Sequence, residues 1–174
     1  MQSLGFFIPH TRSLQGFTLV ELLVCMGLLS VLLALAIPNW QQTQERSRVE
    51  AARDQLMNDL QSARIRALQG GEDVQIVRLR DCAWSSAADN DWSCGWQLVT
   101  KNNQAVLQTS QVQTALQITF SKSTPLTINA RGDLGTVGDR WVIKSRQNIA
   151  TSIASVVCVN SASRLRWQSG ESCS

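Results

Sequence analysis

Hydrophobic residues dominate one long block near the start of the chain, from Phe17 to Ile37. The block has 21 residues, and its only polar or small interruptions are Thr18, Glu21, Gly27 and Ser30. As an α-helix it would extend about 32 Å at roughly 1.5 Å per residue. That length matches the ~30 Å hydrocarbon core of a bilayer. The block therefore predicts a transmembrane helix.

From Asn39 to Gln69 the pattern becomes amphipathic. Apolar residues recur at spacings of three and four, which is typical of one helix face packed on a protein core. The members of this stripe are Val49, Ala52, Leu56, Leu60, Ala63 and Ala67. The charged side chains lie mostly off the stripe, and we expect Arg64 and Arg66 to face solvent. Gly70-Gly71 predicts the end of the helix. Pro38 predicts a bend between the two halves, with a plain helix boundary as the alternative.

After Gly71 the helical period disappears and short β-branched runs separated by turn residues take its place. The predicted strands are Val74–Arg80, Trp96–Thr100, Ala105–Thr109, Ala115–Phe120, Leu126–Asn129, Arg140–Lys144 and Ser155–Asn160. Consecutive short strands with tight turns favour antiparallel pairing. An amphipathic helix laid on such a sheet predicts an α+β fold, with the long helix at the N-terminus.

Composition argues against an enzyme. The net charge is only +3, which does not by itself indicate nucleic-acid binding. The only histidine, His10, precedes the apolar block, so removal of a leader would leave no histidine for a Ser-His, Cys-His or His-metal site. The sequence also contains no phosphate loop. We therefore expect no catalytic activity, no cofactor and no metal.

Four of the five cysteines lie in the predicted β domain, and the fifth, Cys25, lies in the apolar block. The four form two local groups without a CxxC pair, which argues against zinc. In an oxidising compartment they would form disulfides. Four cysteines permit three pairings, of which we favour Cys82–Cys94 and Cys158–Cys173. Each of these bonds would stabilise the domain by roughly 3 kcal/mol through loop closure.

The N-terminal segment differs from an ordinary secretory signal, because its polar leader precedes the apolar block and no A-x-A-like site follows it. The residues from Gly16 to Glu21, GFTLVE, resemble the prepilin peptidase motif of type IV pilins and type II secretion pseudopilins. The resemblance implies cleavage between Gly16 and Phe17 and methylation of the new N-terminal Phe17. It also implies that Glu21 sets filament register by pairing with the amine of a neighbouring subunit, and that the helix loosens near Pro38.

The cost of burying a charge also indicates a special role for Glu21. A charged side chain inside an apolar helix costs ~2.5–3.5 kcal/mol at the bilayer centre on insertion scales, so it marks a functional site by default. The alternative is a glutamate near the helix end whose carboxylate snorkels to the membrane surface.

The C-terminal strand, short turn and basic strand around Arg164 and Arg166 resemble the end of the GspH/FimT family of minor pilins and pseudopilins. The turn Asn129–Gly132 fits the same family. In the FimT branch a Gly-Arg-x-Arg motif is linked to DNA binding during natural transformation, and Ser163 stands here at the glycine position. Two arginines on one strand face can bridge phosphates, with Lys144 and Arg146 extending the patch and Trp167 stacking on a base. The alternative is a solvated strand face, with Leu165 and Trp167 in or near the core.

These observations predict four segments: a cleaved leader (1–16), a transmembrane and filament-core helix (17–38), an amphipathic helix (39–71) and a periplasmic β domain (72–174). The expected location is the inner membrane, with a single span and later incorporation into a filament. The expected partners are other pilins through the N-terminal helix, and the prepilin peptidase. The first functional hypothesis is assembly of a type IV pilus or a type II secretion pseudopilus. The alternative is a pilus-exposed subunit that binds double-stranded DNA without sequence preference.

Overall fold

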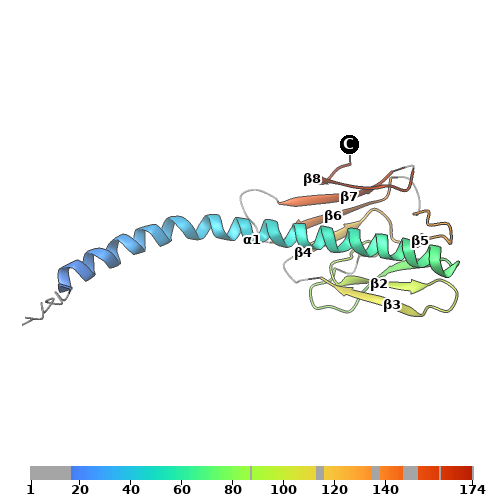
Figure 1. Cartoon of the computed structure of the whole chain (residues 1–174), viewed down its shortest axis with the longest axis horizontal. Coiled ribbons are helices and arrows are strands. Elements are labelled where there is room, and N and C mark those ends of the chain that lie inside the picture. Colours follow the sequence, from blue (N-terminus) through green and yellow to red (C-terminus); the bar gives the residue numbers. More distant parts are fainter. Residues whose placement is uncertain are drawn as a thin grey trace, which may run out of the picture. The chain divides into compact units, whose positions relative to one another are not determined.

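The computed structural model describes residues 17–86, 88–112, 116–134, 138–146, 153–160 and 162–173, and only the backbone of residues 34–39. In this part of the chain a long helix, α1 (Leu19–Gly70), precedes eight strands (Figure 1). The strands are β1 (Val74–Arg78), β2 (Gly95–Thr100), β3 (Val106–Gln111), β4 (Leu116–Phe120), β5 (Leu126–Ile128), β6 (Arg140–Ser145), β7 (Ala154–Val159) and β8 (Leu165–Ser169). The predicted leader, with Gly16 at its end, lies outside the described residues.

The chain divides into two compact units, Met1–Trp40 and Gln41–Ser174, close to the boundary predicted at Pro38. The backbone of α1 is helical across Pro38. A plain helix boundary at this proline is therefore wrong, whereas the bend stays a prediction. None of the helical residues whose side chains are described forms a stretch long and apolar enough to cross a membrane.

The second unit contains two four-stranded sheets, with the orders β3-β2-β1-β5 and β4-β6-β7-β8. Every neighbouring pair in both sheets is antiparallel, as the short strands and tight turns predict. The C-terminal part of α1 lies across both sheets (Figure 1). The α+β fold with a helix on antiparallel sheets is thus confirmed.

The core forms where the apolar stripe of α1 meets the inner faces of the two sheets. All six predicted members of the stripe are buried. They belong to the same hydrophobic cluster as three aromatic residues, in which the Phe120 and Trp141 rings stack at 4.4 Å between centroids and Trp92 packs edge-on against both. Full burial of Leu56 or Leu60 contributes roughly 1.5–3 kcal/mol each. This packing holds α1 on the domain.

Several polar residues of α1 that we expected outside the stripe are buried. Asp59 is 5% exposed and Arg53 is 8% exposed. Arg64, expected in solvent, is half-buried and hydrogen-bonded to the β domain. The helix face in contact with the sheets is therefore wider than its apolar stripe, and its borders consist of specific polar contacts.

Candidate functional site

The first turn of α1 carries the acidic residue that the prepilin motif singles out. The N–H of Glu21 donates a hydrogen bond to Thr18 Oγ1 (3.2 Å), so Thr18 caps the helix. An acidic side chain in the first turn is also favoured by the helix dipole. Among the described residues Glu21 has no ion-pair partner. Its carboxylate is thus held at the start of α1, four residues from Phe17, and is free to pair with another molecule.

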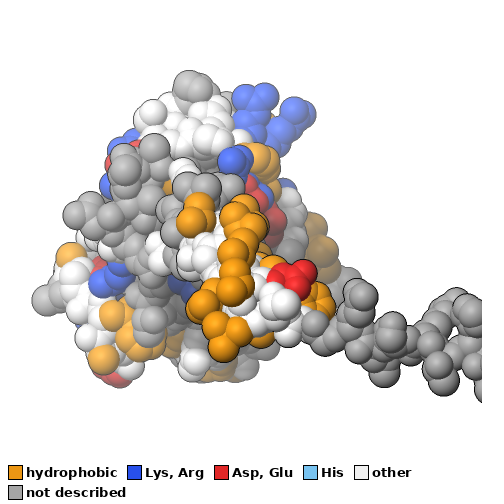
Figure 2. All heavy atoms as spheres, turned by 90° about the vertical axis from the view of Figure 1, so that its left-hand side faces the viewer, with side chains coloured by type: hydrophobic (Ala, Val, Ile, Leu, Met, Phe, Trp, Pro, Cys, Tyr) orange, Lys and Arg blue, Asp and Glu red, His pale blue; other side chains and the backbone are white. Residues whose placement is uncertain are grey.

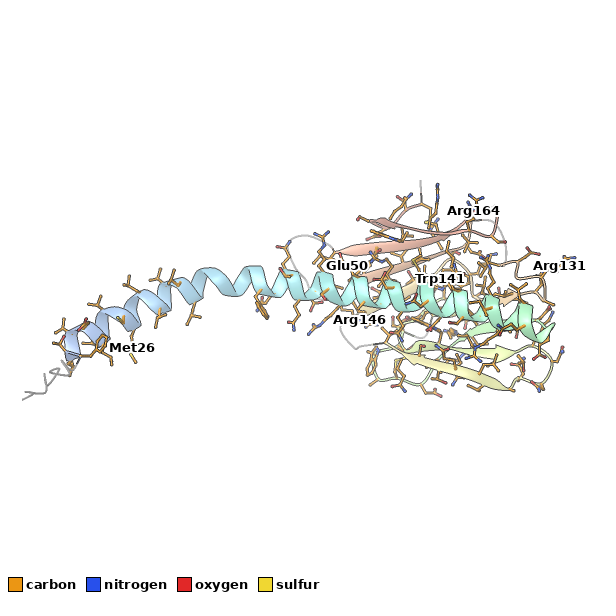
Figure 3. All side chains as sticks on the ribbon, in the orientation of Figure 1. Met26, Glu50, Arg131, Trp141, Arg146 and Arg164 are labelled. Atoms are coloured by element: carbon orange, nitrogen blue, oxygen red, sulfur yellow. A yellow bond between two sulfur atoms is a disulfide. The ribbon has the colours of Figure 1, made fainter. Side chains whose placement is uncertain are left out.

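Hydrophobic side chains surround Glu21 on every side of the helix. Figure 2 views the protein from this end and shows hydrophobic side chains gathered in a continuous band. Each of these side chains is more than half exposed, and they are Phe17, Leu19, Val20, Leu22, Leu23, Val24, Met26, Leu28, Leu29, Val31, Leu32 and Leu33. Figure 3 shows Met26 pointing away from the helix axis. A helix that is apolar all round is normally buried in lipid or in protein, so this surface requires a partner.

The second candidate region is the turn that leads into β8. Ser163 adopts a positive φ of 54°, a conformation that glycine adopts at lower cost. The turn is closed by the Ser163 N–H, which donates to the Asn160 carbonyl (3.0 Å), and by the Arg164 N–H, which donates to Asn160 Oδ1 (2.9 Å). The Ser163 hydroxyl accepts the N–H of Leu134 (3.2 Å). Serine therefore replaces the glycine of Gly-Arg-x-Arg without loss of the left-handed turn, and its side chain adds a tertiary contact.

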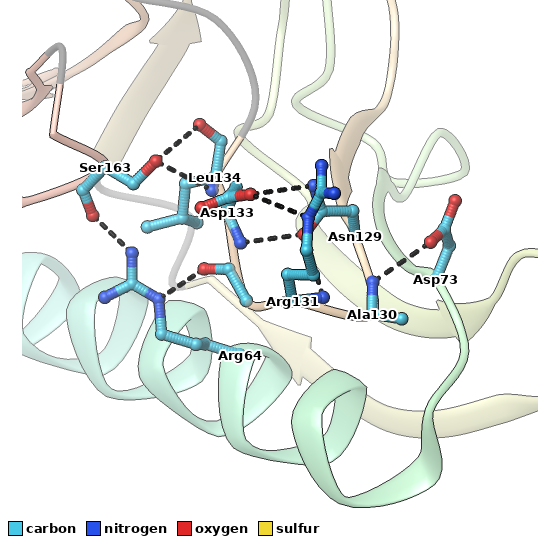
Figure 4. Close-up of polar contacts among 9 residues, drawn as sticks. Arg64, Asp73, Asn129, Ala130, Arg131, Asp133, Leu134 and Ser163 are labelled. Carbon is cyan, nitrogen blue, oxygen red and sulfur yellow. Dashed lines mark hydrogen bonds and ion pairs between the residues drawn. The ribbon is translucent and has the colours of Figure 1, made fainter.

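Arg64 connects this turn to α1 and to the turn at Gly132 (Figure 4). Its Nε donates to the Gly132 carbonyl (2.8 Å), and its Nη2 donates to the Ser163 carbonyl. Gly132 has a φ of 81°, and a Cβ there would lie 3.2 Å from side-chain atoms of Arg64 and Leu68. Glycine is thus required by both the backbone conformation and the close approach of α1. The sequence offered no signal for this contact, because Arg64 and Ser163 are 99 residues apart.

Strand register brings together arginines that are distant in the sequence. Arg140 of β6 lies opposite Cys158 of β7, which lies opposite Arg166 of β8. Directly paired residues share a sheet face, so Arg140 and Arg166 lie on the same outer face, about 10 Å apart at their Cα atoms. Arg164 precedes β8 by one residue and is also exposed. Within the described residues these three guanidinium groups have no hydrogen-bond or ion-pair partner. We call them the outer-face arginines.

Lys144 shares the outer face with Arg140 but lies four residues further along β6, and the other residues proposed for this patch lie elsewhere. Lys144 forms an ion pair with Glu171 (2.6 Å), and Arg146 Nε donates to the Leu116 carbonyl (2.8 Å). Figure 3 shows Arg146 and Arg164 well apart on the domain. Trp167 alternates with Arg166 along β8 and so points to the opposite face. The structure therefore does not bring Lys144, Arg146 or Trp167 together with the two arginines of the tail. Arg140 was missed because only the strand register reveals it.

A polar hollow of about 450 Å³ adjoins Arg140 on the same face. It is lined by Asn90, Thr119, Phe120, Ser121, Arg140 and Val142. Hydroxyl, amide and guanidinium groups in this arrangement offer hydrogen bonds to an anionic ligand. The hollow therefore extends the outer-face arginines toward β4.

Both favoured disulfides are present, Cys82–Cys94 and Cys158–Cys173. The second ties the C-terminal tail to β7, beside Arg166. The first closes the loop that contains Asp91, whose carboxylate accepts hydrogen bonds from Ser86 N–H and Oγ (2.6 Å each) and from Ser93 N–H (2.9 Å). Burial raises the pKa of Asp91, but these hydrogen bonds outweigh it and hold the pKa below its ordinary value. The loop is thus organised around a carboxylate anion.

Comparisons with known proteins agree with this architecture. The family model for the prokaryotic N-terminal methylation motif matches residues 12–37, and the model for type II transport protein GspH matches residues 52–163. No curated protein sequence matches the chain. The methylation motif and the pilin family imply incorporation into a pilus or pseudopilus and anchoring in the inner membrane.

Solved structures show the same fold. The type IV minor pilin FimU of Pseudomonas aeruginosa PAO1 is 22% identical, with a TM-score of 0.56 over 76% of this chain and 99% of that one. A second crystal form of FimU gives 23% identity and a TM-score of 0.53 over 72% and 99%. The minor pseudopilin EpsH of the Vibrio cholerae type 2 secretion system is 11% identical, with a TM-score of 0.52 over 70% and 97%. The chain therefore belongs to the GspH family and is a minor pilin or pseudopilin that assembles with other pilins into a type IV pilus or a type II secretion pseudopilus.

Proposed function

We propose that the chain is made as a precursor that spans the inner membrane once, with residues 41–174 in the periplasm. The prepilin peptidase cuts it between Gly16 and Phe17, and the new N-terminal Phe17 is methylated. The match of the methylation motif to residues 12–37 supports this processing. The two disulfides support an oxidising compartment for the domain. The observation that carries the proposal is the apolar surface all round the start of α1, which needs lipid before assembly and neighbouring helices afterwards.

Within that surface, Glu21 determines how a subunit aligns with its neighbour. A carboxylate transferred into a dry filament core without a counter-charge is costly, whereas a paired one is tolerated. The amine freed at Phe17 of the adjacent subunit supplies the counter-charge. The single acidic side chain in this apolar segment thus defines one favoured axial position for each subunit.

The test compares Glu21→Ala and Glu21→Gln with Ser30→Ala, which removes a different polar group from the same apolar segment. In cells that make the whole filament, all three variants should be inserted, cleaved and methylated, as checked by the mass of the N-terminal peptide. Both Glu21 variants should be strongly depleted from sheared filaments or cross-linked pseudopili, and Ser30→Ala should not. Incorporation of Glu21→Gln at the wild-type level would refute the register role of the charge.

A second candidate function is binding of double-stranded DNA without sequence preference. The specific observation in its favour is that Arg140, Arg164 and Arg166 are exposed at one end of the outer face and have no partner within the described residues. Guanidinium groups recognise phosphate oxygens through paired hydrogen bonds. Three such contacts would give weak, salt-sensitive binding with a slope of about −2.7 in log K against log salt.

This function can be tested with residues 41–174, the compact unit that contains the core. Duplex DNA is titrated at several salt concentrations against the wild-type domain, Arg164→Ala with Arg166→Ala, Arg140→Ala, and Arg80→Ala. The last is a matched control, because Arg80 is an exposed arginine outside the patch. The double variant should reduce the magnitude of the slope, from about −2.7 to about −0.9. Arg140→Ala alone should reduce the magnitude by about one. If Arg80→Ala has the same effect as Arg140→Ala, the outer face is not the binding site.

A further inference from the structure

The last strand, β8, forms one edge of its sheet and presents unpaired backbone groups. Gly170 N–H donates to the Ala154 carbonyl, and Asn160 N–H donates to the Arg164 carbonyl. These two bonds fix which residues of the antiparallel pair exchange hydrogen bonds with β7. By alternation, the N–H and C=O groups of Leu165, Trp167 and Ser169 point away from β7. None of these groups has a hydrogen-bond partner within the described residues, so they form an open pairing edge.

Both ends of this edge are fixed in place. At the start of β8, the Ser163 turn is bound by Arg64 and Leu134. After its end, the Cys158–Cys173 disulfide fastens the tail to β7. β8 also pairs with β7 in unbroken register over five residues. By contrast β3, at the edge of the other sheet, is paired through a register shift at Leu98/Val99, an irregularity that discourages strand addition. A preorganised edge adds a partner strand at a lower entropic cost.

The side chains beside the edge define what a partner strand must carry. On the inner face, Trp167 remains 48% exposed, and the Arg53 guanidinium lies 3.9 Å from its ring centroid. On the outer face, Arg164 and Arg166 stand without partners. An added strand therefore finds an aromatic surface on one face and positive charge on the other.

We propose that β8 is a docking edge for an extended segment of a different pilin subunit, which adds as a further strand to the β4-β6-β7-β8 sheet. The segment carries an apolar side chain beside Trp167 and acidic side chains at the alternate positions that face Arg164 and Arg166. Main-chain hydrogen bonds to Leu165, Trp167 and Ser169 hold it, as in other cases of strand addition. This inference rests on the proposed function, because it names the partner that assembly brings to the domain.

A second copy of the chain does not fit this edge. Pairing β8 with the β8 of a second copy would place Arg164 and Arg166 of one copy near Arg164 and Arg166 of the other. Like charges across neighbouring strands are destabilising, and charge complementarity selects partners at an interface. An acidic segment of another subunit satisfies the charges that a second β8 would repel.

The test uses the full-length chain in cells that make the whole filament, with the photo-cross-linking residue benzoylphenylalanine at position 167. On this background, Ser169→Pro removes one outward N–H and leaves the pairing with β7 intact, because the Ser169 N–H does not face β7. Ser169→Ala keeps the N–H and is the matched control. Benzoylphenylalanine at Val142, on the outer face of β6, reports non-specific proximity.

We expect a cross-link from position 167 to another pilin, at least about tenfold weaker in Ser169→Pro than in Ser169→Ala, and none from position 142. Equal yields in the two Ser169 variants would overturn the proposal, as would a cross-link only to a second copy. Filament incorporation that depends on Glu21, together with no cross-link from position 167, would overturn the docking edge and leave the assembly function standing. Incorporation that does not depend on Glu21 would instead count against the proposed register role of that residue.

Discussion

Asp59 supplies the sharpest test of how α1 is held on the β domain. Its Oδ2 accepts hydrogen bonds from Trp96 Nε1 (2.8 Å) and Ser110 Oγ (2.6 Å), and its Oδ1 accepts one from Gln108 Nε2 (2.6 Å). The side chain is 5% exposed and Trp96 is fully buried. One carboxylate on the helix thus satisfies donors from two strands, 37 to 51 residues away in sequence. Replacing Asp59 by alanine leaves these donors without an acceptor.

The cost follows from the burial of each donor. A buried donor left without an acceptor costs about 1–3 kcal/mol. Trp96 and Ser110 are buried and lose their acceptor, whereas the half-buried Gln108 can bond to water. Asp59→Ala should therefore destabilise the domain by about 2–4 kcal/mol. For a domain of this size, that lowers the melting temperature by roughly 10 °C.

The assay is thermal and urea unfolding of residues 41–174, with Asp54→Ala and Asp59→Asn as companions. Asp54 is on the same helix but is exposed, so its replacement leaves no buried tryptophan or serine donor without an acceptor and should cost less than the loss of Asp59. Asp59→Asn keeps one acceptor oxygen, which can face Trp96 and Ser110, so it should cost less than the alanine variant. If Asp59→Ala and Asp54→Ala unfold within about 0.5 kcal/mol of each other, the reasoning is refuted.

Three further predictions concern the turn, the acidic loop and the tail. Gly132→Ala should lower the free energy of unfolding by about 1–2 kcal/mol, measured by urea unfolding, because its φ is positive and the new Cβ meets Arg64; an unchanged midpoint would contradict this. Asp91 has a lowered pKa, so its contribution to stability is present above about pH 4 and is lost as pH falls through its folded pKa. In acid titration, the stability of Asp91→Asn should therefore fall less steeply below pH 4 than that of the wild-type domain. Stability curves that fall in parallel for the two proteins would contradict this prediction. Cys158→Ser with Cys173→Ser should lower stability by about 3 kcal/mol in non-reducing calorimetry, and an unaltered melting temperature would show that the bond adds nothing.

The sequence predicted elements whose signal is a local period. The spacing of Val49, Leu56 and Leu60 identified the helix face in the core, and β-branched runs between turn residues identified β1 to β7 to within a few residues. The strand β8 was expected only from the family resemblance. Both cysteine pairs could be favoured because each closes a short local loop. In each case the residues that determine the structure are near one another in the chain, so a pattern along the sequence was sufficient.

Contacts between distant segments could not be predicted in this way. Arg64 was expected in solvent because charge is normally exposed, and its acceptors are backbone carbonyls that no sequence pattern reveals. Arg140 joined Arg166 only once the register of two strand pairs was known. Conversely, Lys144 was expected to extend the patch. Its ion pair with Glu171 could not be foreseen, because no pattern along the sequence links the two residues. Hydrogen-bond donors and ion pairs brought together by tertiary folding carry no periodic signal.

The hydroxyl of Ser163 explains how a serine can occupy the glycine position of the tail motif. A non-glycine residue in the left-handed conformation costs roughly 1–2 kcal/mol. At Ser163 the hydroxyl accepts a hydrogen bond from Leu134, and the carbonyl accepts one from Arg64. A typical hydrogen bond contributes about 0.5–1.5 kcal/mol, and one to a charged group contributes more. The carbonyl contact would also form with glycine at position 163, so the hydroxyl contact is the one by which serine offsets part of the backbone cost. Because Arg64 simultaneously binds the Gly132 turn, the backbone before Arg164 cannot shift without also breaking that contact. The position of Arg164 is therefore determined by the helix, and any partner of β8 meets an edge whose start is fastened to α1.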